Sequence, residues 1–344
     1  MAASARVTIR DVAQHAGVSQ PTASLVLGNH PRARVAPATR ERVLEAAATL
    51  GYRPNVVAQS LARGRSFALG VIVPDLRNPF FADVIAGAER VASAAGYAML
   101  LCGETERPVA SHLDTLISRQ IDGVILDAAN AASLDAGALT GVNVVLVDEP
   151  SERWPGVASD ATGAGRLAAE HLLGLGHRAI AFIGPSSDVH TFRMRERGFV
   201  RALRAADVTL PSPWLRRAPA TVAGGRDAMR ALLNGRTRPS AVFCANDLIA
   251  VGALKAAAEA RVRVPAELSL VGCDDIEMAQ LVTPELTTIA VPARELGARA
   301  ARLLLRQLAG EKPRAQSAPL AVRLVARGTT GPAPADASPA APVA

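Results

Sequence analysis

This sequence of 344 residues is poor in cysteine, aromatic residues and lysine, and it has no long apolar run. Its three cysteines are odd in number, lie far apart and include no C-x-x-C pair, which argues against a disulfide framework and favours a reducing compartment. No stretch of about 18 apolar residues is present, so we expect no membrane span. The N-terminal residues MAASARVTIRDVAQ lack the apolar core of a signal peptide, and we therefore expect a cytoplasmic protein.

The signatures of several enzyme classes are missing as well. The chain has no G-K-[ST] sequence, because its only lysines are Lys255 and Lys312, and it has no G-x-S-x-G elbow. Its six histidines are scattered without metal-ligand spacing. Residues 163–168 fit G-x-G-x-x-A, but no acid for a ribose hydroxyl follows the next strand, so we interpret these glycines as tight strand–helix packing. We expect no enzymatic activity, no cofactor and no metal site.

The positive charge is concentrated at the N-terminus. Residues 1–65 hold nine arginines and three acids, a net charge of +6, so the other 279 residues carry only +1 of the total of +7. A strongly basic segment indicates a polyanionic partner, and nucleic acid is the first candidate. On charge alone, a basic, solvated face of a small domain remains the alternative.

Three short helices are predicted within this basic segment. Thr8 and Ser19 are capping residues at the starts of the first two helices, and Gly17 separates the two. A third amphipathic helix is expected over about residues 37–50. Its inward-facing residues are expected to be Val43, Leu44, Ala47 and Leu50. A helix, a tight turn with glycine and a capped helix together form the helix-turn-helix pattern.

Several short stretches of the chain carry a family resemblance. They are TIRDVA at 8–13, AGVS at 16–19, TRERV at 39–43, LGYRPN at 50–55, GVIVPD at 70–75, NPFF at 78–81 and LTTI at 286–289. In these stretches the chain resembles the LacI/GalR family of bacterial transcription regulators over essentially its whole length, the two tails excepted. The resemblance implies an N-terminal all-α helix-turn-helix head and an α/β periplasmic-binding-protein-like sensor of two Rossmann-like lobes.

The resemblance assigns DNA contacts to the head. In such a head the second helix enters the major groove, where Gln20, Pro21 and Leu25 would meet base edges. Gln20 would grip an adenine through N6 and N7, and Leu25 would touch a thymine methyl group, unless Leu25 is a buried core residue. Phosphate contacts, which position the head without reading sequence, are expected from Thr8, Ser19, Thr22, Ser24 and Thr39.

Residues 55–62, NVVAQSLA, resemble the hinge helix of the family, which becomes ordered on DNA. Asn55, Ala58 and Leu61 are the expected contacts, with Ala58 flat in the minor groove and Leu61 wedged into a central base step. The alternative is an ordinary linker helix with Leu61 packed on the sensor. The adjoining Arg63-Gly64-Arg65 suits phosphate and favours the DNA contact.

From Phe67 onward, short apolar runs alternate with helical stretches rich in Ala and Leu, which predicts parallel sheets covered by helices on both faces. The predicted strands are residues 69–73, 98–102, 123–126, 142–147, 179–183, 241–244 and 268–272. The resemblance implies that the chain crosses between two lobes three times, near residues 160, 291 and 321. Each lobe would then be discontinuous in sequence.

These patterns predict the following organisation. We expect a head over residues 1–53, a hinge over 54–65, a sensor over 66–330 and a disordered Pro/Ala-rich tail over 331–344. Within the sensor, the N-terminal lobe would comprise about 66–160 and 292–320, and the C-terminal lobe about 161–291 and 321–330.

Polar residues follow many of the predicted strands, at the edge where ligands bind in open α/β sheets. A ring of carboxylates and amides with a few aromatic rings is typical of a pocket for a sugar or another polyol. By this position and by match to the family, the expected effector contacts are Asp75, Phe80, Phe81, Arg195, Asn246, Asp247 and Asp274. For Asp127, Asp148 and Asp275, helix capping is the favoured interpretation.

We therefore predict a cytoplasmic, homodimeric transcription repressor, nucleoid-associated when bound, that reads near-palindromic double-stranded DNA and is controlled by a small-molecule effector, expected to be a sugar. Two other functions are weighed against it. The missing signal peptide and the basic head argue against a periplasmic-type sugar-binding protein. The absent nucleotide and catalytic motifs argue against an enzyme with a Rossmann-like cleft.

Overall fold

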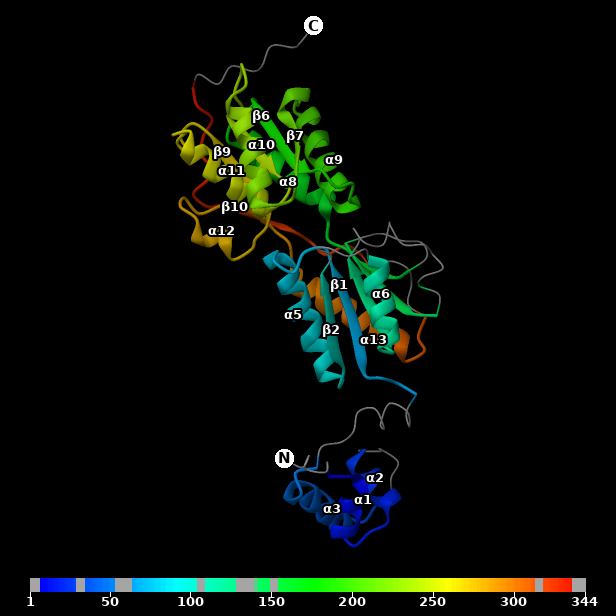
Figure 1. Ribbon diagram of the computed structural model, residues 1–344. Helices are drawn as coiled ribbons and strands as arrows, with labels where there is room; N and C mark the ends of the chain where they lie inside the picture. Colours follow the sequence, from blue (N-terminus) through cyan, green and yellow to red (C-terminus); the bar gives the residue numbers. More distant parts are fainter. Residues whose placement is uncertain are drawn as a thin grey trace. The chain divides into compact units, whose positions relative to one another are not determined.

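The computed structural model describes residues 7–28, 35–52, 64–103, 109–127, 139, 141–148, 154–312 and 318–335. The chain divides between Phe67 and Ala68 into two compact units, which are described separately. Figure 1 shows the smaller N-terminal unit in dark blue and the larger unit from cyan to red. The prediction of a helix-turn-helix head followed by a two-lobed α/β sensor is confirmed.

The first unit is a bundle of α1 (Ile9–His15), α2 (Gln20–Leu27) and α3 (Pro37–Thr49). Thr8 begins α1 with a capping box: its Oγ1 accepts from the Asp11 N–H, and the Asp11 carboxylate accepts from the Thr8 N–H. Ser19 caps α2 by accepting from the N–H of Thr22. Both expected helix starts are thus present.

Small apolar side chains from all three helices form the core of this unit. They are Val12, Ala13, Ala16, Ala23, Val26, Val43, Ala46 and Ala47. The prediction that Leu44 faces the core is wrong. Leu44 is 49% exposed, and Ala46 is the residue of α3 that is buried instead. The reason is the helical repeat of 3.6 residues, which sets Val43, Ala46, Ala47 and Leu50 on one face and turns Leu44 away from it.

The second unit contains two sheets. In the first lobe, a five-stranded sheet has the order β2-β1-β3-β4-β5, and the pairs are parallel. Its strands are β1 (Ala68–Val73), β2 (Ala98–Gly103), β3 (Gly123–Asp127), β4 (Asn143–Val147) and β5 (Gly156–Val157). Helices α5 (Pro79–Ala94) and α13 (Ala293–Leu308) pack together against this sheet, and α6 (Val109–Ser118) contributes to a separate core with β1, β3 and β4.

In the second lobe, a six-stranded sheet has the order β11-β10-β9-β8-β6-β7, with only β11 antiparallel. Its strands are β6 (Ile180–Pro185), β7 (Leu215–Ala218), β8 (Ala241–Cys244), β9 (Ser269–Asp274), β10 (Thr287–Ala290) and β11 (Arg323–Val325). Its helices are α8 (Ala161–Gly174), α9 (His190–Ala205), α10 (Val222–Leu233), α11 (Asp247–Glu259), the short α12 (Met278–Leu281) and a 3₁₀ turn (Ser212–Trp214).

The chain passes between the lobes three times. It leaves the first sheet after β5 and enters α8, returns after β10 to form α13, and leaves α13 to form β11. An isolated bridge between Ser159 and Leu320 joins two of these crossings. Each lobe is therefore assembled from separate stretches of sequence, which brings the carboxyl ends of strands from both sheets to a common cleft.

Of the two glycines in residues 163–168, Gly165 mediates helix–helix contact rather than the predicted strand–helix packing, and Gly163 lies against the carboxylate of its own helix cap, Asp160. A Cβ on Gly165 would collide with the carbonyl oxygen of Arg195 on α9, and one on Gly198 of α9 would collide with that of Thr162 on α8. The backbones of α8 and α9 therefore touch, as glycine alone allows. Reciprocal glycine contacts also join α5 to α13, through Gly87 and Gly297, and α10 to α11, through Gly225 and Gly252.

The ordered chain continues past residue 331, where a disordered tail was predicted to begin. The N–H of Ala333 donates to the Leu175 carbonyl, and the Gly331 carbonyl lies 3.1 Å from the ring nitrogen Nε2 of the buried His177. Residues 336–344 of the predicted tail lie outside the described residues. In the part of the chain that is described, no helix has both the length and the apolar character that crossing a bilayer requires.

Candidate functional site

The first unit presents one face of α2 to solvent. Ala23 and Val26 point into the core, whereas Gln20, Pro21, Ser24 and Leu25 are exposed. Leu25 is 39% exposed, so the alternative of a buried core residue is wrong. An amide, a hydroxyl and a branched apolar side chain at the start of a short, exposed helix can reach base edges in a major groove.

Four of the expected phosphate contacts lie at the cap or in the first turn of a helix. The hydroxyls of Thr8, Ser19 and Thr22 take part in caps, with Ser19 Oγ and Thr22 Oγ1 2.8 Å apart. Thr39 is half-buried in the first turn of α3. Each helix start exposes backbone N–H groups as well as hydroxyls, the donors that phosphate oxygens accept from. The hinge contacts predicted at Asn55, Ala58 and Leu61 lie outside the described residues.

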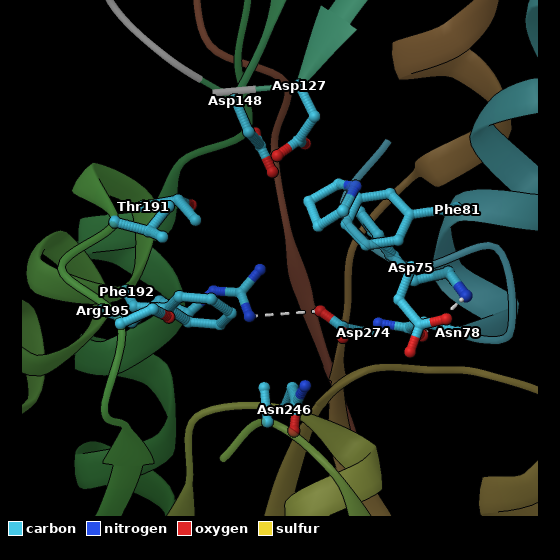
Figure 2. Close-up of a pocket in the computed structure, with 15 residues that line it drawn as sticks. Asp75, Asn78, Phe81, Asp127, Asp148, Thr191, Phe192, Arg195, Asn246 and Asp274 are labelled. Atoms are coloured by element: carbon cyan, nitrogen blue, oxygen red, sulfur yellow. Dashed lines mark hydrogen bonds and ion pairs between the residues drawn. The ribbon is translucent and has the colours of Figure 1, made fainter. Parts of the chain in front are cut away.

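The second unit holds a cavity of about 140 Å³ at the carboxyl ends of strands from both sheets. An apolar cavity of about 150 Å³ is known to hold a benzene-sized ring, so this volume admits a ligand with a single ring. The lining residues are Pro74, Asp75, Asn78, Phe80, Phe81, Asp127, Asp148, Ser187, Val189, Thr191, Phe192, Arg195, Ala220, Asn246 and Asp274. Figure 2 shows the labelled polar side chains converging on this space.

A buried ion pair crosses the floor of this cavity. Arg195 Nη1 lies 3.1 Å from Asp274 Oδ1, and their side chains are only 3% and 6% exposed (Figure 2). Arg195 Nη1 also donates to the Ala245 carbonyl at 2.7 Å, which holds the guanidinium in place. Burial raises the pKa of Asp274 to about 8, although Arg195 opposes that rise. Asp274 also has a φ of 131°, a region that side-chain-bearing residues rarely adopt and that clusters at functional sites.

Asp274 Oδ1 has no hydrogen-bond partner within the described chain beyond its ion pair with Arg195, and two further polar atoms in this cavity have none: Arg195 Nε and Thr191 Oγ1. Both belong to buried residues of α9. Buried polar groups almost always have a partner, and a donor left without one is costly. The pair is therefore well suited to hydrogen-bond a polar molecule in the cleft.

The first lobe contributes aromatic rings and a carboxylate. Phe80 and Phe81 stand at the start of α5 with their ring centroids 5.3 Å apart in an edge-to-face arrangement. Asp75 lines the cavity, but its carboxylate is paired with Arg77. Arg77 Nε lies 3.0 Å from Oδ1, and Arg77 Nη2 lies 3.0 Å from Oδ2. Those bonds hold the pKa of the Asp75 carboxyl below its usual value.

Asp148 and Asp275 cap none of the helices that the structure describes, contrary to the expectation, and Asp127 lines the cavity. Asp148 Oδ1 accepts from the N–H and the hydroxyl of Ser159, at 2.8 and 2.9 Å. Asp275 pairs with Arg327 Nη2 at 2.6 Å. Asp127 and Asp148 both line the cavity. The position of these aspartates after strands pointed to both possible roles, helix cap and pocket residue. Because either role places an aspartate directly after a strand, position in the sequence alone does not distinguish them.

Asp247 is brought near the cavity but does not line it. It is fully buried at the start of α11, where Oδ1 accepts from Thr288 Oγ1 at 2.6 Å and Oδ2 from the Ile276 N–H at 3.0 Å. Burial raises the pKa of Asp247 to about 6, against those two bonds. Its carboxylate thus supports the strand ends beneath the pocket, next to Asn246, whose side chain caps α11 through the Ile249 N–H.

Two family descriptions match this chain. Residues 8–55 match the bacterial regulatory proteins of the lacI family, and residues 169–330 match a periplasmic binding protein-like domain. The first match covers the helix-turn-helix unit, and the second covers most of the second lobe with α13 and β11.

Individual proteins are similar over nearly the full length. The HTH-type transcriptional repressor CytR of Escherichia coli strain K12 is 35% identical over 330 residues, which are 94% of this chain and 96% of that protein. The crystal structure of the Lac repressor dimer bound to operator and the anti-inducer ONPF superposes with a TM-score of 0.84 at 30% identity, covering 95% and 99% of the two chains. The complex of the transcriptional regulator CelR with cellobiose superposes with a TM-score of 0.70 at 30% identity, covering 94% of this chain and 100% of that one.

Proposed function

The chain belongs to the lacI family of bacterial regulatory proteins, and we propose that it is a homodimeric repressor that reads a near-palindromic operator and releases or retains it according to a small-molecule effector. As a member, it is a DNA-binding transcription regulator with an effector-binding C-terminal domain, not an enzyme. The observation that carries the proposal is α2, which turns Gln20 and Leu25 outward while Ala23 and Val26 hold the core.

In this proposal, α2 recognises the bases of the operator. Gln20 donates to N7 and accepts from N6 of an adenine, and Leu25, one turn further on, contacts a thymine methyl group. Pro21 shapes the start of the helix and donates no hydrogen bond. Thr8, Ser19, Thr22, Ser24 and Thr39 contact phosphates.

The hinge completes the DNA contact. Asn55, Ala58 and Leu61 reach the minor groove at the centre of the site, where Leu61 separates a base step. Two heads related by a two-fold axis then require a site whose halves are near-palindromic. This arrangement agrees with a relative whose structure is that of a dimer on its operator.

The effector binds in the cavity between the lobes. Arg195 and Asp274 are placed for the hydroxyls of a ligand, Asn246 and Asp75 for its further polar groups, and Phe80 and Phe81 for its ring face. Asp247 supports this floor through Thr288 and Ile276. A sugar or related polyol suits such a mixture of carboxylates, amides and rings, and a relative is known as a complex with cellobiose.

Control follows from the differential affinity of the ligand for two lobe arrangements. A ligand that favours one arrangement changes the geometry at the hinge and thereby the affinity for DNA, typically by 1–3 kcal/mol or about 5- to 150-fold. The coupling is reciprocal, so operator must change the affinity for the ligand by the same factor.

An unfractionated extract of bacterial small molecules tests this proposal. Operator affinity of the full chain is measured with and without the extract, for the wild type, Arg195→Lys and the control Arg197→Lys, which is exposed on the same helix. We expect a several-fold change in the wild type and in Arg197→Lys, and none in Arg195→Lys, because lysine lacks Nε and the planar fork. An extract that leaves the affinity of all three proteins unchanged contradicts control by an effector.

A further inference from the structure

Two adjacent aspartates at the end of β9 face different spaces. Asp274 lines the cavity between the lobes, where its Oδ1 lies 3.1 Å from Arg195 Nη1 (Figure 2). Asp275 follows directly, but it is not among the described residues that line this cavity. It lines a second cavity of about 350 Å³, which shares Phe80 and Asp274 with the first. The chain therefore places one of two neighbouring carboxylates opposite Arg195 and keeps the other away from it.

The backbone of these two residues has an unusual conformation. The φ angles of Asp274 and Asp275 are 131° and 61°, in the half of the map that residues with a side chain rarely adopt. Two such residues in succession persist only where the surrounding contacts hold them in place. Asp247 supplies one of these contacts, because its Oδ2 accepts a hydrogen bond from the Ile276 N–H at 3.0 Å.

Arg327 supplies a second contact, at Asp275. Arg327 Nη2 lies 2.6 Å from Asp275 Oδ1, and the two side chains are only 10% and 16% exposed. The same guanidinium donates through Nη1 to the Leu286 carbonyl at 2.9 Å. Glu285 lies 3.9 Å from Nε, but its side chain is 60% exposed and adds little. Because one planar group makes both short bonds, its orientation is fixed, and so is the carboxylate that it holds.

The segment that follows β11 holds Arg327 itself in place. The Arg327 N–H donates to Thr287 Oγ1 at 2.9 Å. Two residues further on, Thr329 Oγ1 accepts from the Thr287 N–H and donates to the Leu270 carbonyl, both at 2.8 Å. The segment is thus tied to β9 and β10, although Arg327 is not among the described residues that line either cavity.

Loss of the Arg327 contact would release the Asp275 carboxylate. A carboxylate that is mostly buried and has lost its partner is costly, so it is driven toward another donor. Arg195 is the one arginine or lysine among the described residues that line the cavity between the lobes. A turn that brings Asp275 toward this guanidinium displaces Asp274 from it, and the polar floor that a ligand meets is then altered.

We propose that Arg327 is a positioning residue for effector binding: it holds Asp275 outside the cavity between the lobes and thereby keeps Asp274 opposite Arg195. The inference rests on the proposed function, because effector binding in this cavity is what the positioning serves. Arg327 acts through Asp275 and does not touch the ligand.

The test measures operator affinity of the full chain over a dilution series of the extract of bacterial small molecules. The result is the extract concentration that produces half of the response. Arg327→Lys keeps the charge but lacks the planar fork, so it cannot hold both Asp275 and the Leu286 carbonyl. We expect the half-effective concentration to rise at least about five-fold in Arg327→Lys. It should stay unchanged in Arg323→Lys, which alters an exposed arginine of β11.

A second substitution separates positioning through Asp275 from general support of the lobe. Asp275→Gly removes the carboxylate and suits the φ of 61°, which glycine adopts without strain. It removes the anchor of the turn and should raise the half-effective concentration as well. Because both changes break the same contact, the double variant Arg327→Lys/Asp275→Gly should stay within about two-fold of the more affected single variant. Support of the lobe by another route would instead make the two effects multiply.

The outcomes distinguish this inference from the proposed function. A half-effective concentration in Arg327→Lys equal to that of the wild type overturns the positioning role and leaves effector control standing, and so do effects that multiply in the double variant. A wild type that does not respond to the extract overturns both. Melting temperatures show which variants are folded. If Arg327→Lys is unfolded, Asp275→Gly carries the test alone, and an unchanged half-effective concentration there overturns the proposal.

Discussion

Gly165 of α8 lies directly against the backbone carbonyl of Arg195 on α9, with no room between them for a Cβ. The glycine thereby sets the distance between two helices, and the second of these carries the arginine whose guanidinium pairs with Asp274 in the cavity between the lobes. A sequence feature that resembles a nucleotide-binding fingerprint thus has its effect through the packing of two helices, one of which lines the cavity.

Substitution of Gly165 by alanine is expected to destabilise the protein and to displace Arg195. The added methyl must push α8 and α9 apart, and overpacking of this kind typically costs about 1–3 kcal/mol. Gly174 in the same helix is the matched control, because a Cβ there meets nothing within 4 Å. Thermal unfolding should give a lower melting temperature for Gly165→Ala and an unchanged or higher one for Gly174→Ala. Equal melting temperatures would refute the packing role.

Two exposed leucines of the first unit provide a matched pair for DNA binding. Leu25 on α2 is 39% exposed and Leu44 on α3 is 49% exposed, so neither truncation opens a cavity in the core. We expect Leu25→Ala to weaken operator binding by about 1 kcal/mol or more, roughly 5-fold, and Leu44→Ala to leave it unchanged. Gel shift with purified full-length proteins measures both. A larger effect from Leu44 would mean that a different face of the head meets DNA.

Gln20 should affect specificity as well as affinity. Loss of its bidentate contact in Gln20→Ala is expected to cost about 1–3 kcal/mol, or roughly 5- to 150-fold, and to relax the preference at one base pair per half-site. Gln14, exposed on α1, is the control of the same residue type. Competition with operators substituted at single positions reads out the preference. A uniform loss across all operators would indicate that Gln20 contacts the DNA backbone only.

His177 predicts how the second unit responds to acid. The buried ring lies within hydrogen-bond distance of Ser240 Oγ, Ser269 Oγ and the Gly331 carbonyl, and burial lowers its pKa below 6.5. Between the folded pKa and 6.5, the unfolded chain binds more protons, so stability falls as pH drops through 6.5 and continues to fall until the folded pKa is reached. The slope for one such group is at most about 1.4 kcal/mol per pH unit.

Urea unfolding at pH 7.5 and pH 5.5 checks this sign. The variant His177→Gln should lose part of the difference in stability between the two pH values, and the remainder should include His171 and His190, whose pKa values burial lowers in the same direction. An identical pH dependence in the variant and the wild type would show that the ring is not the titrating group.

Much of the fold could be predicted because its signals are local. Thr8 and Ser19 mark helix starts through bonds to residues three positions ahead, and the buried strands of parallel sheets are short runs of apolar residues. The four strands that were not predicted, β5, β7, β10 and β11, are two to four residues long. Strands this short are set by their neighbours in the sheet, which local composition does not reveal.

The candidate site was predictable in position and less so in detail. Strand ends pointed to the edge of the sheets where the cavity lies, but the role of each carboxylate depends on partners distant in sequence. Asp148 meets Ser159, Asp275 meets Arg327, and Asp247 meets Thr288, so three similar residues at strand ends have three different environments. Likewise, only the contact of α8 with α9 reveals that Gly165 packs helix to helix.

Selection of binding sites from a random DNA pool, at about 50 and 200 mM salt, tests whether the chain reads a DNA sequence as a dimer. We expect enrichment of a two-fold symmetric site with an easily unstacked central step, and we expect this enrichment to survive the higher salt concentration. We also expect Gln20→Ala to change the selected half-site sequence. Binding that is lost at the higher salt concentration, with no sequence enriched, would contradict a sequence-reading dimer built on α2.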